Sequence, residues 1–142
     1  MNDKELWTVM NIIITGMSNF DFTWRFDGSG NLRVQGVKVS VNDVDIVTDE
    51  NGLEIFRKEL NAFVVRDFYN KKKKAWSLIL NINKQEVEIN YYDSVDIDLF
   101  KGMKEISWQN LKLKVLPFIQ SAKYYKLVGK QGTHDLILKY VK

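Results

Sequence analysis

Apolar residues near the start of the chain recur at the spacing of one helical face. They lie at relative positions i, i+1, i+4, i+7, i+8 and i+11: Leu6, Trp7, Met10, Ile13, Ile14 and Met17. This spacing predicts a helix from Lys4 to about Ser18. Cap residues, a proline and apolar spacing predict four further helices: Glu50 to Leu60, capped by the side chain of Thr48; a short one around Asp96 to Met103; one opened by Pro117 and running to about Leu127; and a last one that starts at Thr133.

Alternation of apolar and polar residues predicts the strands. Phe22, Trp24 and Phe26 alternate with polar residues and run into Gly28-Ser29-Gly30, and Val39 to Val47 is predicted as a second strand. Three further runs are typical of an antiparallel meander and two of a hairpin: Phe63 to Tyr69, Ala75 to Ile82 and Glu86 to Tyr92, then Ile106 to Trp108 and Leu111 to Val115. The predicted fold class is α+β, with a mixed, mainly antiparallel sheet flanked by helices.

Length and composition favour a soluble protein of one domain, residues 1–142. The chain is 45% hydrophobic and 27% charged, as is usual for globular proteins. The apolar patch Ile12 to Ile14 is short and is preceded by acidic residues, so it indicates a helix rather than a signal peptide. We therefore expect a cytoplasmic protein with no membrane partner.

The near absence of cysteine and histidine limits the chemistry. The chain has no cysteine and a single histidine, His134. These counts exclude disulfides, thiolate zinc sites, cysteine nucleophiles and multi-histidine metal sites. Any reaction must therefore use carboxylates, lysines and backbone groups, and the net charge of +3 is compatible with phosphate-bearing ligands.

Two carboxylates stand two positions apart on the second predicted strand. Asp43 and Asp45 alternate with apolar residues, so the strand pattern points both side chains to the same face. Two negative charges held so close repel each other unless a cation lies between them. Hard oxygen ligands of this kind suit Mg²⁺, with Mn²⁺ as a substitute, and two such ions can clamp the attacking and leaving oxygens of a phosphoryl displacement.

A third carboxylate is expected from a neighbouring strand. Val87-Glu88-Ile89 repeats the apolar-acid-apolar pattern inside the meander, so Glu88 is the predicted third ligand. Glu86 shares the face of Glu88 and takes its place if the register differs, and Asp93 at the strand end is a weaker contender.

A glycine-serine pair precedes these acids. Gly28-Ser29 follows a predicted strand and opens a predicted helical turn, where backbone N–H groups and a hydroxyl can receive phosphate oxygens. Together with Asp43-x-Asp45 and the distant third acid, the segment Trp24 to Val37 resembles the minimal nucleotidyltransferases of the DNA-polymerase-β-like superfamily. The resemblance covers Trp24 to about Tyr92 and, more loosely, Leu116 to Tyr140, while Asp27 and Gly30 depart from the family pattern.

The resemblance implies transfer of a nucleoside monophosphate from an NTP to an acceptor hydroxyl. Asp43, Asp45 and Glu88 would be the catalytic, metal-binding residues, whereas Gly28, Ser29 and Lys123 would bind the nucleotide. ATP is the expected donor, so the expected reaction is adenylyl transfer. The acceptor stays open among a small molecule such as a drug, a tRNA end and a protein. The resemblance also implies a rival role, an inactive toxin-antitoxin component that binds an α-helical protein partner.

The sequence leaves the roles of several other polar residues open. Lys71 to Lys74 form either a solvated turn or the basis of a second rival, an RNA-binding module. Arg33 and Lys38 are candidates for contacts with a triphosphate. His134, beside Asp135, is either a base or a structural residue.

Overall fold

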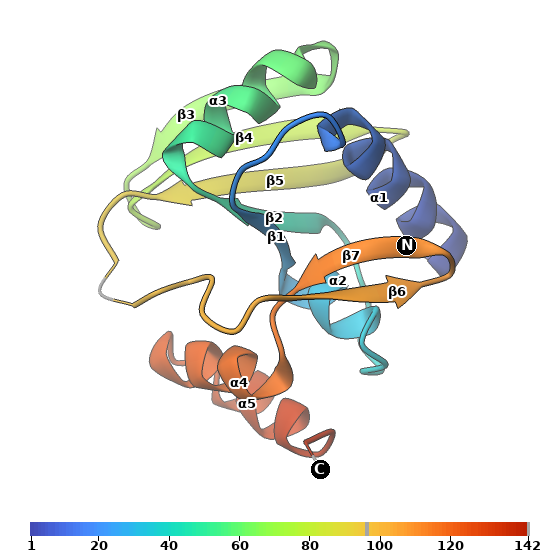
Figure 1. Cartoon of the computed structure of the whole chain (residues 1–142). Helices are drawn as coiled ribbons and strands as arrows, with labels where there is room; N and C mark the ends of the chain where they lie inside the picture. Colours follow the sequence, from blue (N-terminus) through green and yellow to red (C-terminus); the bar gives the residue numbers. More distant parts are fainter. Residues whose placement is uncertain (96, 142) are drawn as a thin grey trace.

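The computed structural model describes residues 1–95 and 97–141 (Figure 1). A five-stranded sheet in the order β1-β2-β5-β4-β3 forms its centre. Its strands are β1 (Trp24–Asp27), β2 (Val44–Thr48), β3 (Val64–Asn70), β4 (Ala75–Ile82) and β5 (Gln85–Tyr92). The helices are α1 (Asp3–Met17), α2 (Gly28–Arg33), α3 (Glu50–Glu59), α4 (Phe118–Leu127), α5 (Gln131–Leu138) and the 3₁₀ turn η1 (Asn61–Phe63). The strands β6 (Lys104–Trp108) and β7 (Leu111–Val115) form a separate hairpin.

The register of the sheet aligns polar residues across its first three strands. β1 pairs antiparallel with β2, which pairs parallel with β5, and the remaining pairs are antiparallel. Asp27 lies opposite Asp45, and Asp45 lies opposite Glu88. Residues directly opposite each other in a sheet point to the same face, so three acidic positions follow one line across the strands.

Different helices lie on the two sides of the sheet. α1 and α3 lie over one face, and α4 and α5 lie on the other side of the molecule (Figure 1). The main core between the sheet, α1 and α3 includes fully buried Phe26, Ile46, Leu78 and Ile89. Leu32 of α2 packs with Ala122, Tyr125 and Ile137 of the C-terminal helices in a second cluster. The face that carries Asp45 therefore opens between the sheet and α4.

The predicted α+β fold with a mixed, mainly antiparallel sheet is confirmed. The prediction of a strand over Val39 to Val47 was wrong in its first half, because β2 begins only at Val44. β1 ends at Asp27, opposite Asp45, so the residues before Val44 have no ladder partner in β1. The apolar residues there are buried without a strand, as fully buried Val41 shows.

Three helix predictions also differ from the structure. The cap of α3 is Asp49, whose side chain accepts a hydrogen bond from the Gly52 N–H, while the Thr48 hydroxyl donates to the Thr23 carbonyl oxygen. The helix predicted from Asp96 to Met103 is absent from residues 97–103, which form turns, and Asp96 lies outside the described residues. α5 begins at Gln131 rather than Thr133. In the described part of the chain, no helix combines the length and the apolar character needed to cross a membrane.

Candidate active site

Three carboxylates meet at the open face of the sheet. Asp45 lies on β2, Glu88 lies on β5, and Asp43 lies in the bend just before β2. Each offers one oxygen such that all three oxygens lie within 4.8 Å of one another. Asp43 reaches this cluster from a bend rather than by strand alternation, but the predicted convergence of the three acids is present. Such a set of hard oxygen donors can hold a divalent cation.

Asp45 is the most strongly perturbed of these carboxyls. Burial, followed by the charges of Asp43, Asp27 and Glu88, raises the pKa of Asp45 from 3.8 to about 8. The direction is that expected for a carboxylate that loses water and gains negative neighbours. The metal-free site therefore favours a protonated Asp45 at neutral pH, and a bound cation would reverse this preference.

The turn at Gly28 closes directly over Asp45. Gly28 has φ +61°, and a Cβ atom placed on it would overlap the Oδ2 atom of Asp45. Only glycine meets both conditions, because it tolerates positive φ and has no Cβ. Ser29 is half-buried in the first turn of α2. The backbone of Gly28 and Ser29 therefore lies against the acidic cluster.

Asp27 is paired within the fold. Its Oδ1 atom accepts a hydrogen bond of 2.9 Å from Nη1 of Arg25, which is only 1% exposed. Arg25 also donates through Nε to the Leu99 carbonyl oxygen at 2.8 Å, and so ties the loop after β5 to the site. Asp27 precedes α2 but makes no side-chain cap to it. The first N–H groups of α2 are therefore not capped by Asp27.

A lysine from the β3–β4 turn reaches the same cluster. Lys73 Nζ donates to Glu88 Oε1 at 2.7 Å. Burial alone would lower the pKa of Lys73, but the hydrogen bond to Glu88 and the charge of Glu88 raise it on balance. Lys71 to Lys74 form one charge run in the sequence, and no pattern along the chain distinguishes Lys73 from its neighbours.

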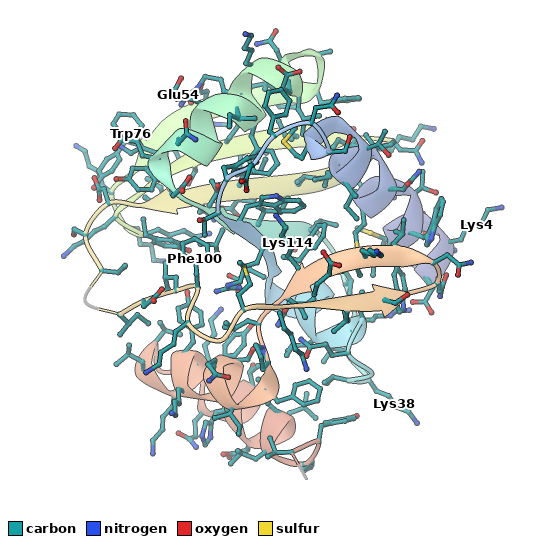
Figure 2. The ribbon with its side chains drawn as sticks, viewed as in Figure 1. Lys4, Lys38, Glu54, Trp76, Phe100 and Lys114 are labelled. Carbon is teal, nitrogen blue, oxygen red and sulfur yellow. The ribbon has the colours of Figure 1, made fainter. Side chains whose placement is uncertain are left out.

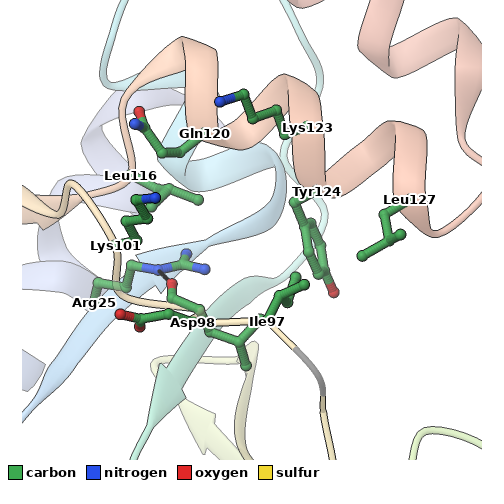
Figure 3. Close-up of a pocket in the computed structure, with 10 residues that line it drawn as sticks. Arg25, Ile97, Asp98, Lys101, Leu116, Gln120, Lys123, Tyr124 and Leu127 are labelled. Atoms are coloured by element: carbon green, nitrogen blue, oxygen red, sulfur yellow. Dashed lines mark hydrogen bonds between the residues drawn. The ribbon is translucent and has the colours of Figure 1, made fainter.

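A cavity of about 460 Å³ lies between α4 and the loop after β5 (Figure 3). None of the three carboxylates lines it, but Arg25, the ion-pair partner of Asp27, does. It has three cationic side chains, Arg25, Lys101 and Lys123, and its other lining residues are Ile97, Asp98, Leu99, Leu116, Gln120, Tyr124 and Leu127. Lys123 and Tyr124 both line it from α4; the Tyr124 ring projects toward Ile97, whereas the Lys123 side chain runs along the helix toward Gln120 (Figure 3). Burial, and then the charge of Asp27, raises the pKa of Tyr124. Tyr124 and Arg25 therefore connect the cavity with the acidic side of the site.

A buried asparagine fixes α4 relative to the glycine turn. Asn31 of α2 is 2% exposed, accepts a hydrogen bond of 2.7 Å from the Leu116 N–H and donates to the Leu116 carbonyl oxygen at 3.3 Å. Gln35 donates to the same carbonyl oxygen at 2.9 Å. Since Leu116 immediately precedes Pro117 and α4, these bonds set where Lys123 lies. Sequence reasoning missed Asn31, which stands in no chemical motif.

The structure does not bring the remaining carboxyl candidates into the cluster. Glu86 is exposed and lies opposite Asn81, two residues along β5 from Glu88. Asp93 accepts a hydrogen bond of 3.3 Å from the Tyr69 hydroxyl. Neither belongs to the three-carboxylate group.

The other charged candidates have contacts elsewhere. Arg33 forms an ion pair with Asp3 at 3.0 Å. Lys38 is exposed and extends away from the body of the molecule (Figure 2). His134 lies on α5, 3.0 Å from Asp135 Oδ1. These contacts give Arg33 and His134 structural partners.

The fold was compared with known proteins. No protein-family model matches the chain, and no curated protein matches its sequence. Among solved structures, the candidate nucleotidyltransferase TM1012 of Thermotoga maritima superposes with a TM-score of 0.81 at 25% identity, over 99% of this chain and 94% of that one. The lincomycin-bound lincosamide antibiotic adenylyltransferase LnuA has a TM-score of 0.66 at 11% identity, over 99% of each chain. The antibiotic-resistance factor ANT(2'')-Ia has a TM-score of 0.66 at 9% identity, over 100% of this chain and 86% of that one.

These similarities confirm the predicted fold over nearly the whole chain. The two antibiotic-related proteins share little sequence with this chain, so their contribution is the fold alone. The similarity to TM1012 extends to a quarter of the residues and supports a nucleotidyl-transfer activity.

Proposed function

Because the chain is a minimal nucleotidyltransferase-fold protein, we propose that it is a Mg²⁺-dependent nucleotidyltransferase that moves NMP from an NTP to an acceptor hydroxyl. ATP is the proposed donor, so the reaction would be adenylyl transfer. The observation that carries the proposal is the meeting of Asp43, Asp45 and Glu88 directly against the Gly28-Ser29 turn. In this arrangement, candidate metal ligands lie beside groups that can donate hydrogen bonds to a phosphate.

The three carboxylates fit a divalent cation. They supply hard oxygen ligands within 4.8 Å of one another, and Mg²⁺ is usually bound by one or two carboxylates together with substrate phosphates. Burial and then the charges of the neighbouring acids raise the pKa of Asp45 to about 8, and the nearby Lys73 ammonium offsets these effects only in part. Mn²⁺ is chemically close enough to replace Mg²⁺. When bound, the cation would stabilise the negative charge that develops at the transferring phosphorus and lower the pKa of the acceptor hydroxyl.

The turn at Gly28 is the proposed phosphate site. Because Asp27 makes no side-chain cap, the N–H groups at the start of α2 can donate to phosphate oxygens of the NTP. The hydroxyl of Ser29 adds a further donor in the same turn. Donors held in place by the fold stabilise a charged group without reorganising as it forms.

The cavity beside α4 is the proposed position of the rest of the nucleotide. Its volume of about 460 Å³ falls within the range of small-molecule sites, and it combines apolar walls with cationic side chains. Exposed Lys123 at its edge would contact the triphosphate, and Tyr124 would lie between the nucleotide and the acidic cluster. If Glu88 does not bind metal, its carboxylate is the proposed base for the proton of the acceptor hydroxyl.

The acceptor is proposed only as a class of group, a hydroxyl. The lincomycin-bound neighbour makes a small drug-like molecule one candidate. A tRNA end and a protein side chain are the others that the sequence suggested.

Nucleotide-dependent stabilisation tests the proposal. A ligand that binds only the native protein raises its melting temperature by mass action. We expect ATP to raise it with Mg²⁺ or Mn²⁺ but not with EDTA. Glu88→Gln should remove most of this shift, while Glu86→Gln, on the same strand and face but outside the cluster, should keep it. Equal shifts with and without metal would exclude metal-bridged nucleotide binding.

A further inference from the structure

The β3–β4 turn sends one of its four lysines back to the acidic cluster. Lys71 to Lys74 are all exposed, and among the described residues Lys73 alone of the four forms an ion pair. The Lys73 backbone N–H donates to Asn70 Oδ1 at 3.1 Å, which shapes the turn. The side-chain ammonium lies 2.7 Å from Glu88 Oε1. Lys73 is therefore a specific neighbour of the site and not merely part of a solvated charge run.

The Lys73 ammonium holds a carboxylate that a metal would need. The side chain of Glu88 is only 14% exposed, so it has limited room for water. A divalent cation bound to Glu88 would lie within a few ångströms of the Lys73 ammonium, and like charges at that separation repel. Glu88 can therefore bind either the Lys73 ammonium or a divalent cation closely, but binding of one weakens binding of the other.

The position of Lys73 also allows a cation to displace its ammonium from Glu88. The side chain of Lys73 is 42% exposed and comes from the tip of a hairpin, so it can swing into solvent without disturbing the sheet. A half-exposed ion pair is weak enough to be broken by a competing cation. The turn conformation depends on the backbone of Lys73 and on Asn70, not on the ammonium.

We propose that Lys73 is a tethered counter-ion, which neutralises Glu88 in the metal-free protein and leaves it when a divalent cation binds. The proposal rests on the proposed function, because it assumes that Asp43, Asp45 and Glu88 hold a metal. Lys73 thus acts through Glu88: it sets how tightly a metal must bind in order to displace the ammonium. Removing its charge should strengthen metal binding.

Direct Mn²⁺ titration followed by electron paramagnetic resonance tests this inference without nucleotide or turnover. We expect Lys73→Met to bind Mn²⁺ about three- to fivefold more tightly than the wild type, because one competing ion pair is removed. Lys72→Met removes the same charge from the same turn and should change the affinity by less than about 1.5-fold, because a charge exposed to water is screened. In a Glu88→Gln background, Lys73→Met should give no gain. Lys73→Gln serves as a second variant if Lys73→Met does not fold.

The outcomes separate this inference from the proposed function. If the wild type binds Mn²⁺ and the Lys73 variants behave like Lys72→Met, the counter-ion role is wrong while the metal site stands. A gain that persists in the Glu88→Gln background also overturns it, because the effect then does not pass through Glu88. If no variant binds Mn²⁺ and ATP with Mg²⁺ gives no thermal shift, the metal site itself fails.

Discussion

Asp45→Asn should make the metal-free protein more stable and the enzyme inactive. The substitution keeps the size of the side chain and removes its charge. Burial and the acidic neighbours raise the pKa of Asp45 to about 8 from 3.8, so the folded protein binds a proton at Asp45 that the unfolded chain has released. A group with a raised carboxyl pKa therefore lowers stability as the pH rises from about 4 to about 8.

The size of the effect follows from linkage. At pH 7 the difference between 7 and the ordinary value of 3.8 corresponds to about 4 kcal/mol at 1.36 kcal/mol per unit, which is the ceiling of the gain. Water entry and movement of the neighbouring carboxylates reduce it, so we expect a gain of about 2 kcal/mol, or roughly 8 °C in melting temperature. The gain should be smallest near pH 4.5 and largest near pH 8. Activity should fall on the order of 10²- to 10³-fold or more, because the charge that develops at the α-phosphorus of the transferred nucleotidyl group is no longer stabilised.

Urea unfolding in EDTA at several pH values measures the stability, and Mg²⁺-dependent ATP stabilisation measures the site. Asp21→Asn, at an exposed aspartate before β1, is the matched control and should change neither quantity. Lower stability of Asp45→Asn at pH 8, with nucleotide binding intact, would mean that Asp45 is a structural aspartate and would refute the reasoning.

Three further substitutions test the parts of the site separately. Gly28→Ala should lower the free energy of unfolding in urea by about 2 kcal/mol or more and remove the ATP thermal shift, because its Cβ would overlap Asp45. Gly36→Ala, also at positive φ but with open space around it, should lower the free energy of unfolding less and keep the shift. Lys123→Ala should weaken ATP binding several-fold in calorimetry and leave the stability unchanged. Lys126→Ala, on the same helix, should leave ATP binding unchanged. Equal effects of the two substitutions would exclude Lys123 from the nucleotide site. Asn31→Ala should cost about 2 kcal/mol, because it leaves the buried Leu116 N–H unpaired, while the Leu116 carbonyl oxygen keeps the bonds from Gln35 and Ser121. An unchanged urea midpoint would contradict that anchoring role.

The elements of the fold could largely be predicted because local patterns determine them. The helical spacing near the N-terminus predicted α1 to within one residue at each end, and the runs of the meander predicted β3, β4 and β5 to within one residue. The errors came where tertiary contacts override local pattern. Val41, before β2, is apolar because it packs in the core, yet it has no partner in β1. The loop of residues 97–103 is held in part by Arg25 rather than by helical hydrogen bonds.

The candidate site likewise contains residues that the sequence could identify and residues that only tertiary contacts reveal. Gly28, Ser29, Asp43, Asp45 and Glu88 could be selected from the sequence because they stand in motifs with a chemical meaning. Lys73 could not be separated from the other lysines of its turn, since only the folded hairpin brings it to Glu88. Asn31 and Arg25 act through contacts with residues more than seventy positions away, which no local pattern reveals.

The most direct test of nucleotidyl transfer follows the two ends of the triphosphate. The protein is incubated with Mg²⁺, cell extract as the source of acceptors, and ATP labelled in either the α- or the γ-phosphate; Asp45→Asn and EDTA serve as controls. We predict that the α label appears on an acceptor molecule, that the γ label does not, and that both controls abolish the signal. Transfer of the γ label, or α labelling that persists in Asp45→Asn or in EDTA, would contradict the assignment.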